Sequence, residues 1–202
     1  MKQKFEKTLN KVDKLTNTPY LDLYYYNYTI NGKQSHYYVA SRRKPEDLAI
    51  YNVGKVEPDC VRIIPYFKKD DRIFVVLTRE FRQPINDFVY STPAGRIEFG
   101  EDAKTCAVRE LEEEIGCTVK KLDLMVSPSF SSVGLTDECI IVYSAEIELT
   151  SQQNLQDCET IERFPIELKD LKRFAEEEIK DFQAKTILTI FYYETMFNIK
   201  KK

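Results

Sequence analysis

The stretch from Gly95 to Gly116 constrains the fold of this chain more than any other. Gly95 and Gly100 bracket a tight loop, Asp102 is suited to cap the start of a helix, and Gly116 is suited to end that helix in the left-handed conformation. The pattern predicts a loop, a short helix over residues 102–115 and a second loop.

The predicted helix carries an anionic surface beside an apolar one. Successive helical residues are rotated by about 100°, so Glu110, Glu113 and Glu114 fall within one sector about 100° wide. The adjoining apolar stripe contains Val108, Leu111 and Ile115. One face of the helix is therefore expected to be buried, and its neighbour to be negatively charged.

Such a group of carboxylates needs a positive charge nearby, because like charges at helical spacing repel. Arg109 can pair with Glu113 four residues later, but one arginine cannot neutralise the whole group. Hard divalent cations prefer oxygen ligands, and Mg²⁺ is the expected ion, with Mn²⁺ as an alternative. An acidic helix face exposed to solvent is the simpler reading of a glutamate-rich run, and the spacing of the residues argues against it.

The same run resembles the Nudix box, whose pattern is G-x5-E-x7-R-E-U-x-E-E-x-G-U with U a bulky aliphatic residue. The matching residues are Gly95, Glu101, Arg109, Glu110, Leu111, Glu113, Glu114 and Gly116. Cys117 departs from the pattern at the last aliphatic position, which concerns packing rather than chemistry. The resemblance implies a mixed α/β fold, an α/β/α sandwich around a mixed sheet.

Further segments are similar to the ADP-ribose pyrophosphatase subgroup of that family. They are residues 78–84, 91–95, 158–166 and 181–186, so the resemblance covers about residues 60–190. It implies hydrolysis of the pyrophosphate bond of a nucleoside diphosphate sugar, with ADP-ribose converted to AMP and ribose 5-phosphate. Other nucleotide substrates, such as GDP-mannose or a nucleoside triphosphate, and a non-catalytic nucleotide sensor are the alternatives.

The resemblance also implies roles for the residues of the box. Glu110 and Glu114 are the expected metal ligands, Glu113 supports or shares them, and the backbone carbonyl of Ala94 completes a coordination sphere. Glu101 enters the same group from the loop side.

Residues outside the box are expected to contact the water and the substrate. The subgroup often takes its base from the loop before the last helices, where Glu159 and Glu162 are the matching residues, and a solvated loop acid is the alternative reading of Glu159. Arg82 is expected to hold the pyrophosphate, since a guanidinium binds phosphate oxygens in pairs. Tyr37 and Arg42 are expected to contact the nucleobase, and packing in the core is the alternative for Tyr37.

Residues 20–30 and 36–40 alternate aromatic and polar side chains around Asn31-Gly32, which indicates a β-hairpin. We expect an N-terminal β segment over residues 1–57 and a catalytic domain over residues 58–202. An isolated hairpin is only marginally stable, so the β segment is expected to pack in a homodimer, where it would supply nucleobase contacts. Packing of the segment on its own catalytic domain is the alternative.

Further strands are expected at residues 61–67, 73–78, 122–126 and 138–149, and helices in the C-terminal third.

Composition argues against several other classes of protein. The formal net charge is −3 with mixed signs along the chain, so neither nucleic acid nor a membrane surface is an expected partner. No apolar run approaches the roughly 20 residues that span a bilayer. Five cysteines without C-x-x-C spacing argue against a disulfide framework and for buried thiols in a cytoplasmic protein.

Overall fold

The computed structural model describes residues 5–52, 54, 57–150, 152–155 and 160–200. The chain forms two compact units, one made of Met1–Pro58 with Pro128–Ile140 and the other of Asp59–Ser127 with Ile141–Lys202. We call them the N-terminal unit and the sheet unit. The grouping of residues 128–140 with the N-terminal strands was not predicted from the sequence.

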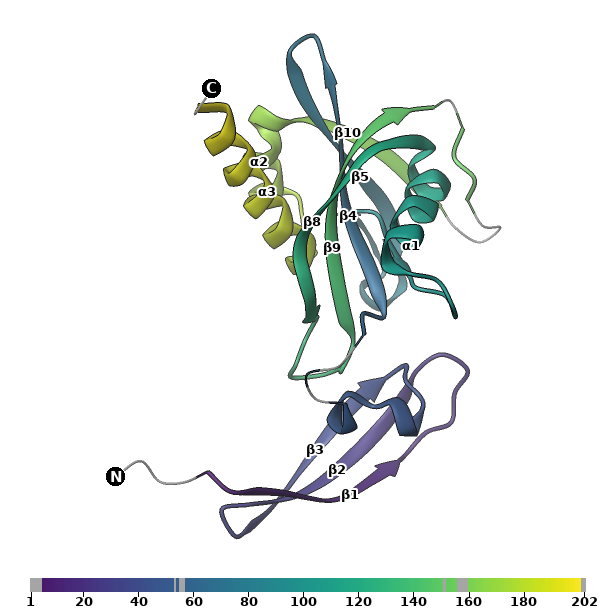
Figure 1. Ribbon diagram of the computed structural model, residues 1–202, viewed down its shortest axis with the longest axis vertical. Coiled ribbons are helices and arrows are strands. Elements are labelled where there is room, and N and C mark those ends of the chain that lie inside the picture. The colour runs from purple at the N-terminus through teal and green to yellow at the C-terminus, as the bar shows by residue number, and fades with distance from the viewer. Residues whose placement is uncertain (1–4, 53, 55–56, 151, 156–159, 201–202) are drawn as a thin grey trace. The chain divides into compact units, whose positions relative to one another are not determined.

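The N-terminal unit is built on a three-stranded antiparallel sheet in the order β1-β2-β3 (Figure 1). Its strands are β1 (Lys7–Lys14), β2 (Asp22–Ile30) and β3 (Lys33–Ser41). Asn31 and Gly32 form the two-residue turn with positive φ angles of 48° and 77°, so the predicted hairpin is confirmed.

Two short 3-10 turns, Pro45–Asp47 and Ala49–Tyr51, follow β3. Leu48 between them packs with Tyr24, Tyr26 and Val39 in the core of this unit. Alternate tyrosines of β2 therefore serve as core residues, as a pleated strand requires.

The sheet unit contains a seven-stranded sheet in the order β10-β5-β4-β9-β8, with β6 paired to β5 and β7 paired to β4. The strands are β4 (Cys60–Lys69), β5 (Arg72–Arg82), β6 (Asp87–Ser91), β7 (Ala94–Arg96), β8 (Cys117–Phe130), β9 (Cys139–Leu149) and β10 (Ile161–Glu167). A 3-10 turn at Gln83–Ile85 separates β5 from β6. All four predicted strands of this region are present; β4, β5 and β8 are longer than predicted, and β9 is one residue shorter. Strand β10 falls in the C-terminal third, which was expected to be helical.

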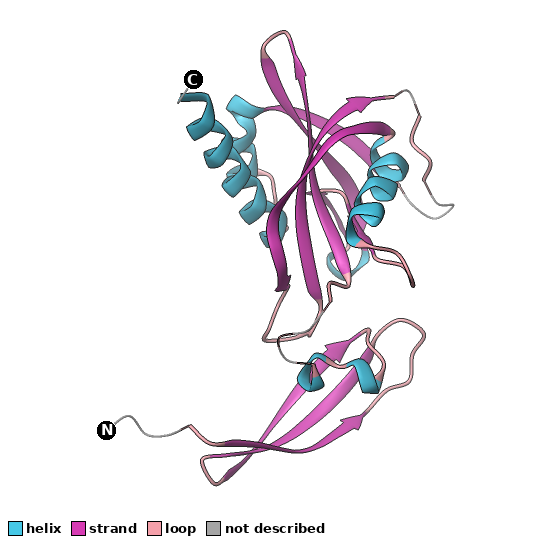
Figure 2. Cartoon of the chain, in the orientation of Figure 1, coloured by secondary structure: helices cyan, strands magenta, loops and turns pink. Residues whose placement is uncertain are grey.

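Helices cover both faces of this sheet (Figures 1 and 2). Helix α1 (Ala103–Glu110) lies on one face, and α2 (Leu168–Glu177) and α3 (Phe182–Lys200) lie on the other. The expected α/β/α sandwich is thereby confirmed. Within the described residues, no helix is long and apolar enough to cross a bilayer.

Helix α1 begins and ends as predicted but changes form in the middle. The Asp102 side chain accepts hydrogen bonds from the backbone N–H groups of Lys104 and Thr105, and Gly116 ends the segment at φ 64°. Between them, Leu111–Ile115 form a π-helical turn, η4, rather than the regular α-helix assumed from the sequence. Such turns are rare and are frequently found at functional sites.

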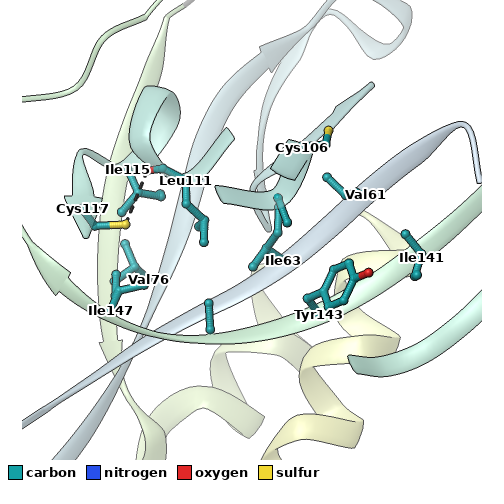
Figure 3. Packing of buried hydrophobic residues seen from close by; sticks show 12 residues of the cluster. Val61, Ile63, Val76, Cys106, Leu111, Ile115, Cys117, Ile141, Tyr143 and Ile147 are labelled. Carbon is teal, nitrogen blue, oxygen red and sulfur yellow. Dashed lines mark hydrogen bonds between the residues drawn. The ribbon is translucent and has the colours of Figure 1, made fainter. Parts of the chain in front are cut away.

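The core of the sheet unit lies between α1 and the sheet (Figure 3). Leu111 and Ile115 are fully buried against Val61, Ile63 and Val76 of the central strands. Cys106 and Cys117 pack in this core as free thiols, and Cys139 is also buried, as expected. Cys158 lies outside the described residues.

Candidate active site

Arg109 lies at the centre of a cluster of glutamate carboxylates. Its Nε and Nη2 atoms donate to the two oxygens of Glu101 at 2.9 and 3.0 Å, and Nη1 donates to Glu110 at 2.7 Å and to Glu113 at 3.3 Å. The predicted pairing with Glu113 is confirmed, and two further carboxylates join it. The Arg109 guanidinium, assisted by the backbone N–H of Glu98, lowers the pKa of Glu101 to about 2. Arg109 therefore holds the loop carboxylate and the helix carboxylates together.

Glu110 and Glu114 are buried, with 9% and 8% of their surface exposed. Burial of a carboxylate is costly unless it is paired or bound to a cation. Three carboxylates, those of Glu101, Glu110 and Glu113, share Arg109, so negative charge is concentrated at this point.

The glycine at position 95 makes room for the Glu110 carboxylate. A Cβ atom built on Gly95 would lie 1.8 Å from Glu110 Oε1. The carboxylate thus packs directly on the backbone of β7, the strand that begins with Ala94. This close approach brings a buried anionic oxygen to the part of the chain that carries the Ala94 carbonyl.

The donors fit a hard divalent cation in kind, because they are carboxylate oxygens, two of them from the buried Glu110 and Glu114. Among the described residues, no three acidic, cysteine or histidine side chains lie close enough to hold one ion. Glu101, Glu110 and Glu113 are drawn to Arg109 instead.

The loop after β9 is hydrogen-bonded to the backbone of Glu113 and Glu114 in η4. Gln153 Nε2 donates to the carbonyl oxygens of Glu114 at 2.5 Å and of Ile161 at 3.1 Å, and the Asn154 N–H donates to the Glu113 carbonyl at 2.9 Å. The described part of this loop therefore lies beside the expected metal ligands.

The two candidate bases differ in what the structure says of them. Glu159 lies outside the described residues. Glu162, on β10, is paired with Arg79 at 2.9 Å and its side chain is 60% exposed. Within the described part of the chain, Glu162 forms no hydrogen bond or ion pair with the glutamates of α1 and η4.

Arg82 lies at the end of β5 and is half-exposed. Its Nη2 atom is 2.5 Å from Glu80 Oε1. Burial raises the pKa of Glu80, and the Arg82 guanidinium counteracts that rise. The ion pair orients the guanidinium while leaving part of it open to solvent.

A network behind the loop that precedes Ala94 was not identified from the sequence. Arg62 lies opposite Ala94 in the pairing of β4 with β7, and its Nη2 atom is 3.0 Å from Asp181 Oδ2. Ser91 donates to the same oxygen at 2.9 Å. Asp181 falls in a segment similar to the subgroup, but Arg62 carried no sequence signal.

Tyr37 and Arg42 lie in the N-terminal unit. The Tyr37 hydroxyl donates to the Gly134 carbonyl at 2.8 Å, and its side chain is 47% exposed, so it is not a core residue. Arg42 donates to the Tyr20 carbonyl at 3.3 Å and lies 3.9 Å from Glu138.

Comparison with known families agrees with the glutamate-bearing helix and the sandwich around it. The family model described as NUDIX domain matches residues 57–188. The chain belongs to the Nudix family, and the membership predicted from the box is confirmed.

Two of the similar relatives are named for ADP-ribose. An ADP-ribose pyrophosphatase of Bacillus subtilis (strain 168) is 33% identical over 122 residues, which cover 59% of this chain and 65% of the relative. An ADP-ribose pyrophosphatase of Saccharomyces cerevisiae is 29% identical over 157 residues, covering 74% of this chain and 63% of the relative. The matched region thus spans just under two thirds of each relative.

A solved structure described as that of an ADP compounds hydrolase has the same fold. Its TM-score is 0.75 at 15% identity, and the match covers 99% of this chain and 98% of that one.

Proposed function

We propose that this protein is a hydrolase that cleaves the pyrophosphate bond of a nucleoside diphosphate sugar, and that ADP-ribose is converted to AMP and ribose 5-phosphate. The observation that carries the proposal is the pair of buried carboxylates, Glu110 and Glu114, on a segment packed against the Gly95 backbone. The names of the relatives from Bacillus subtilis and Saccharomyces cerevisiae support the choice of substrate.

Nudix hydrolases generally use a divalent metal, and here the proposed ion is Mg²⁺, with Mn²⁺ as an alternative. Glu110, Glu113, Glu114 and the Ala94 carbonyl would hold it. Such an ion, when bound, offsets phosphate charge and lowers the pKa of coordinated water. Arg109 positions these carboxylates and restrains them through its contacts with Glu110 and Glu113.

The remaining steps fall to side chains of the chain itself. Arg82 binds two phosphate oxygens through its planar guanidinium, which is already oriented by Glu80. Glu159 accepts the proton of the attacking water, and the attachment of Gln153 and Asn154 beside Glu113 and Glu114 supports a base from this loop. Glu162 is the alternative base, and it would have to leave its ion pair with Arg79.

The N-terminal unit is proposed to contact the nucleobase through Tyr37 and Arg42, in a homodimer. The half-exposed Tyr37 ring supports this role, because it offers a surface on which a base can stack. The free thiols of Cys106 and Cys117 are compatible with a cytoplasmic location of the protein.

The experiment compares two neighbouring glutamates of one helical turn. Glu114→Gln removes a buried charge, and Glu112→Gln removes an exposed one from the same segment. With ADP-ribose and saturating Mg²⁺, we expect kcat for AMP release to fall by at least about 100-fold in E114Q and by less than about twofold in E112Q. A rate in E114Q within tenfold of the parent would show that Glu114 is not a ligand.

A further inference from the structure

The N-terminal unit contains a cavity of about 270 Å³ whose walls are aromatic and aliphatic. Tyr26, Tyr28, Tyr37 and Phe130 are its aromatic residues, and Asp137 is the acidic residue of its lining. Tyr26 and Asp137 are buried, as are the aliphatic Val39 and Ala49, whereas Tyr37 and Phe130 are 47% and 44% exposed. The cavity is therefore closed on one side and accessible on the other.

Two polar atoms in the buried part have no hydrogen-bond partner within the described chain: Tyr26 Oη and Asp137 Oδ1. Tyr26 is 6% exposed and Asp137 is 9% exposed. The other oxygen of Asp137 accepts a hydrogen bond from the Ala49 N–H at 3.2 Å, so the carboxylate is held in place. A buried polar atom without a partner destabilises the protein, so a ligand that supplies the missing partner is favoured.

The charge of the lining limits what that ligand can be. The lining contains one carboxylate, and none of its residues is lysine, arginine or histidine. A neutral ligand would leave the buried carboxylate without a counter-charge, whereas a cation would supply it. Aromatic rings also attract cations through their faces.

We propose that this cavity binds a small organic cation, namely a primary ammonium group carried on an apolar or aromatic body. The ammonium group donates to Asp137 Oδ1 and to Tyr26 Oη, and the body lies among Tyr28, Tyr37 and Phe130. The cavity is slightly smaller than the usual range of about 300–1,000 Å³, so the ligand is small. The proposal concerns the N-terminal unit alone and does not rest on the proposed hydrolase function.

The test is calorimetric titration of the full chain with benzylammonium and with benzyl alcohol, which has a similar shape and no charge. We expect benzylammonium to bind with one site per chain and benzyl alcohol to bind at least about tenfold more weakly, the loss expected for a charged hydrogen bond. Equal affinity for the two probes, or no binding of benzylammonium at millimolar concentration, would overturn the proposal.

Variants assign the binding to the two unpartnered atoms. Asp137→Asn keeps an oxygen that can accept from the Ala49 N–H but loses the charge, and we expect about tenfold weaker binding of benzylammonium. Tyr26→Phe removes only the hydroxyl and should weaken binding by a few fold. Asp71→Asn, on an exposed turn of the sheet unit, is the matched charge control and should bind as the parent does.

Two further results would also contradict the proposal. One is unchanged affinity in both D137N and Y26F. The other is adenosine that binds more tightly than benzylammonium and with equal affinity to D137N, because the cavity would then recognise a neutral base. Thermal unfolding of each variant is followed in parallel, and if D137N does not fold, the Y26F variant and the benzyl alcohol comparison decide.

Discussion

The Glu110 carboxylate occupies the space in which a side chain at position 95 would begin. This contact explains the glycine of the box, because any side chain at position 95 would occupy the space of the Glu110 carboxylate. No special backbone angle is involved. Gly95 does not have a positive φ, unlike Gly100 and Gly116. The requirement at position 95 is therefore one of space.

Replacing Gly95 by Ala should then displace Glu110 and lower kcat for AMP release from ADP-ribose by at least about 100-fold. The atoms that clash are the far end of a flexible side chain, so the free energy of unfolding should change by less than about 1.5 kcal/mol. Steady-state kinetics and urea unfolding of the same sample measure the two quantities. Parental kcat in G95A would mean that the position of Glu110 does not matter for turnover.

The contacts that were predicted correctly from the sequence join residues that are close along the chain. The pairing of Arg109 with Glu113, the Asp102 cap and the left-handed Gly116 all follow from spacing within one helix. Arg62 and Asp181 are far apart in the sequence and meet only because β4 and the start of α3 pack together. Such a pair depends on tertiary structure, which one sequence does not display.

At the scale of elements, the missed strands have physical explanations. The residues of β1 are mostly charged or polar and mostly exposed, so no apolar alternation marks the strand. Strand β10 contains Pro165, which lacks the N–H that a central strand would need. Because β10 is the first strand in the order of the sheet, proline is tolerated there as at other sheet edges.

Asp181 connects α3 to the sheet. It accepts hydrogen bonds from the backbone N–H groups of Gln183 and Ala184 at the start of α3 and pairs with Arg62 of β4. Burial alone would raise the pKa of Asp181, but Arg62, the Ala184 N–H and Ser91 together hold it below its usual value. A lowered pKa means that this carboxylate stabilises the fold above its unfolded pKa of about 4, and that the stabilisation is lost as the pH falls through the folded value.

Asp181→Asn keeps a capping oxygen but loses the charge, so it should lower the free energy of unfolding by about 1–3 kcal/mol at pH 7. The difference from the parent should shrink as the pH falls below about 4 and through the lowered pKa of Asp181, because the parent loses the same charge there. Urea unfolding at several pH values measures it, with Asp71→Asn as the exposed control. A difference that is constant over this range would show that the charge of Asp181 does not stabilise the fold.

At the scale of the whole molecule, exposed aromatic side chains of the N-terminal unit support the proposed homodimer. Tyr20 and Tyr38 of the N-terminal unit are 74% and 53% exposed, which leaves aromatic side chains that a second copy could cover. Removing residues 1–57 would also strip the strands with which Pro128–Ile140 form one unit, so the intact chain is the correct sample.

Sedimentation equilibrium of the intact protein at micromolar concentration should give twice the chain mass of 23.8 kDa. A single species with the mass of one chain would exclude nucleobase contacts shared between subunits.

A panel of nucleotide substrates, assayed with Mg²⁺ for release of nucleoside monophosphate, tests the proposed hydrolysis of ADP-ribose most directly. The panel contains ADP-ribose, GDP-mannose and a nucleoside triphosphate at equal concentration. We predict the highest kcat/KM for ADP-ribose, AMP and ribose 5-phosphate as its products, and loss of the reaction when the metal is chelated. A higher kcat/KM for the triphosphate, or hydrolysis that persists without divalent metal, would contradict the proposed metal-dependent hydrolysis of ADP-ribose.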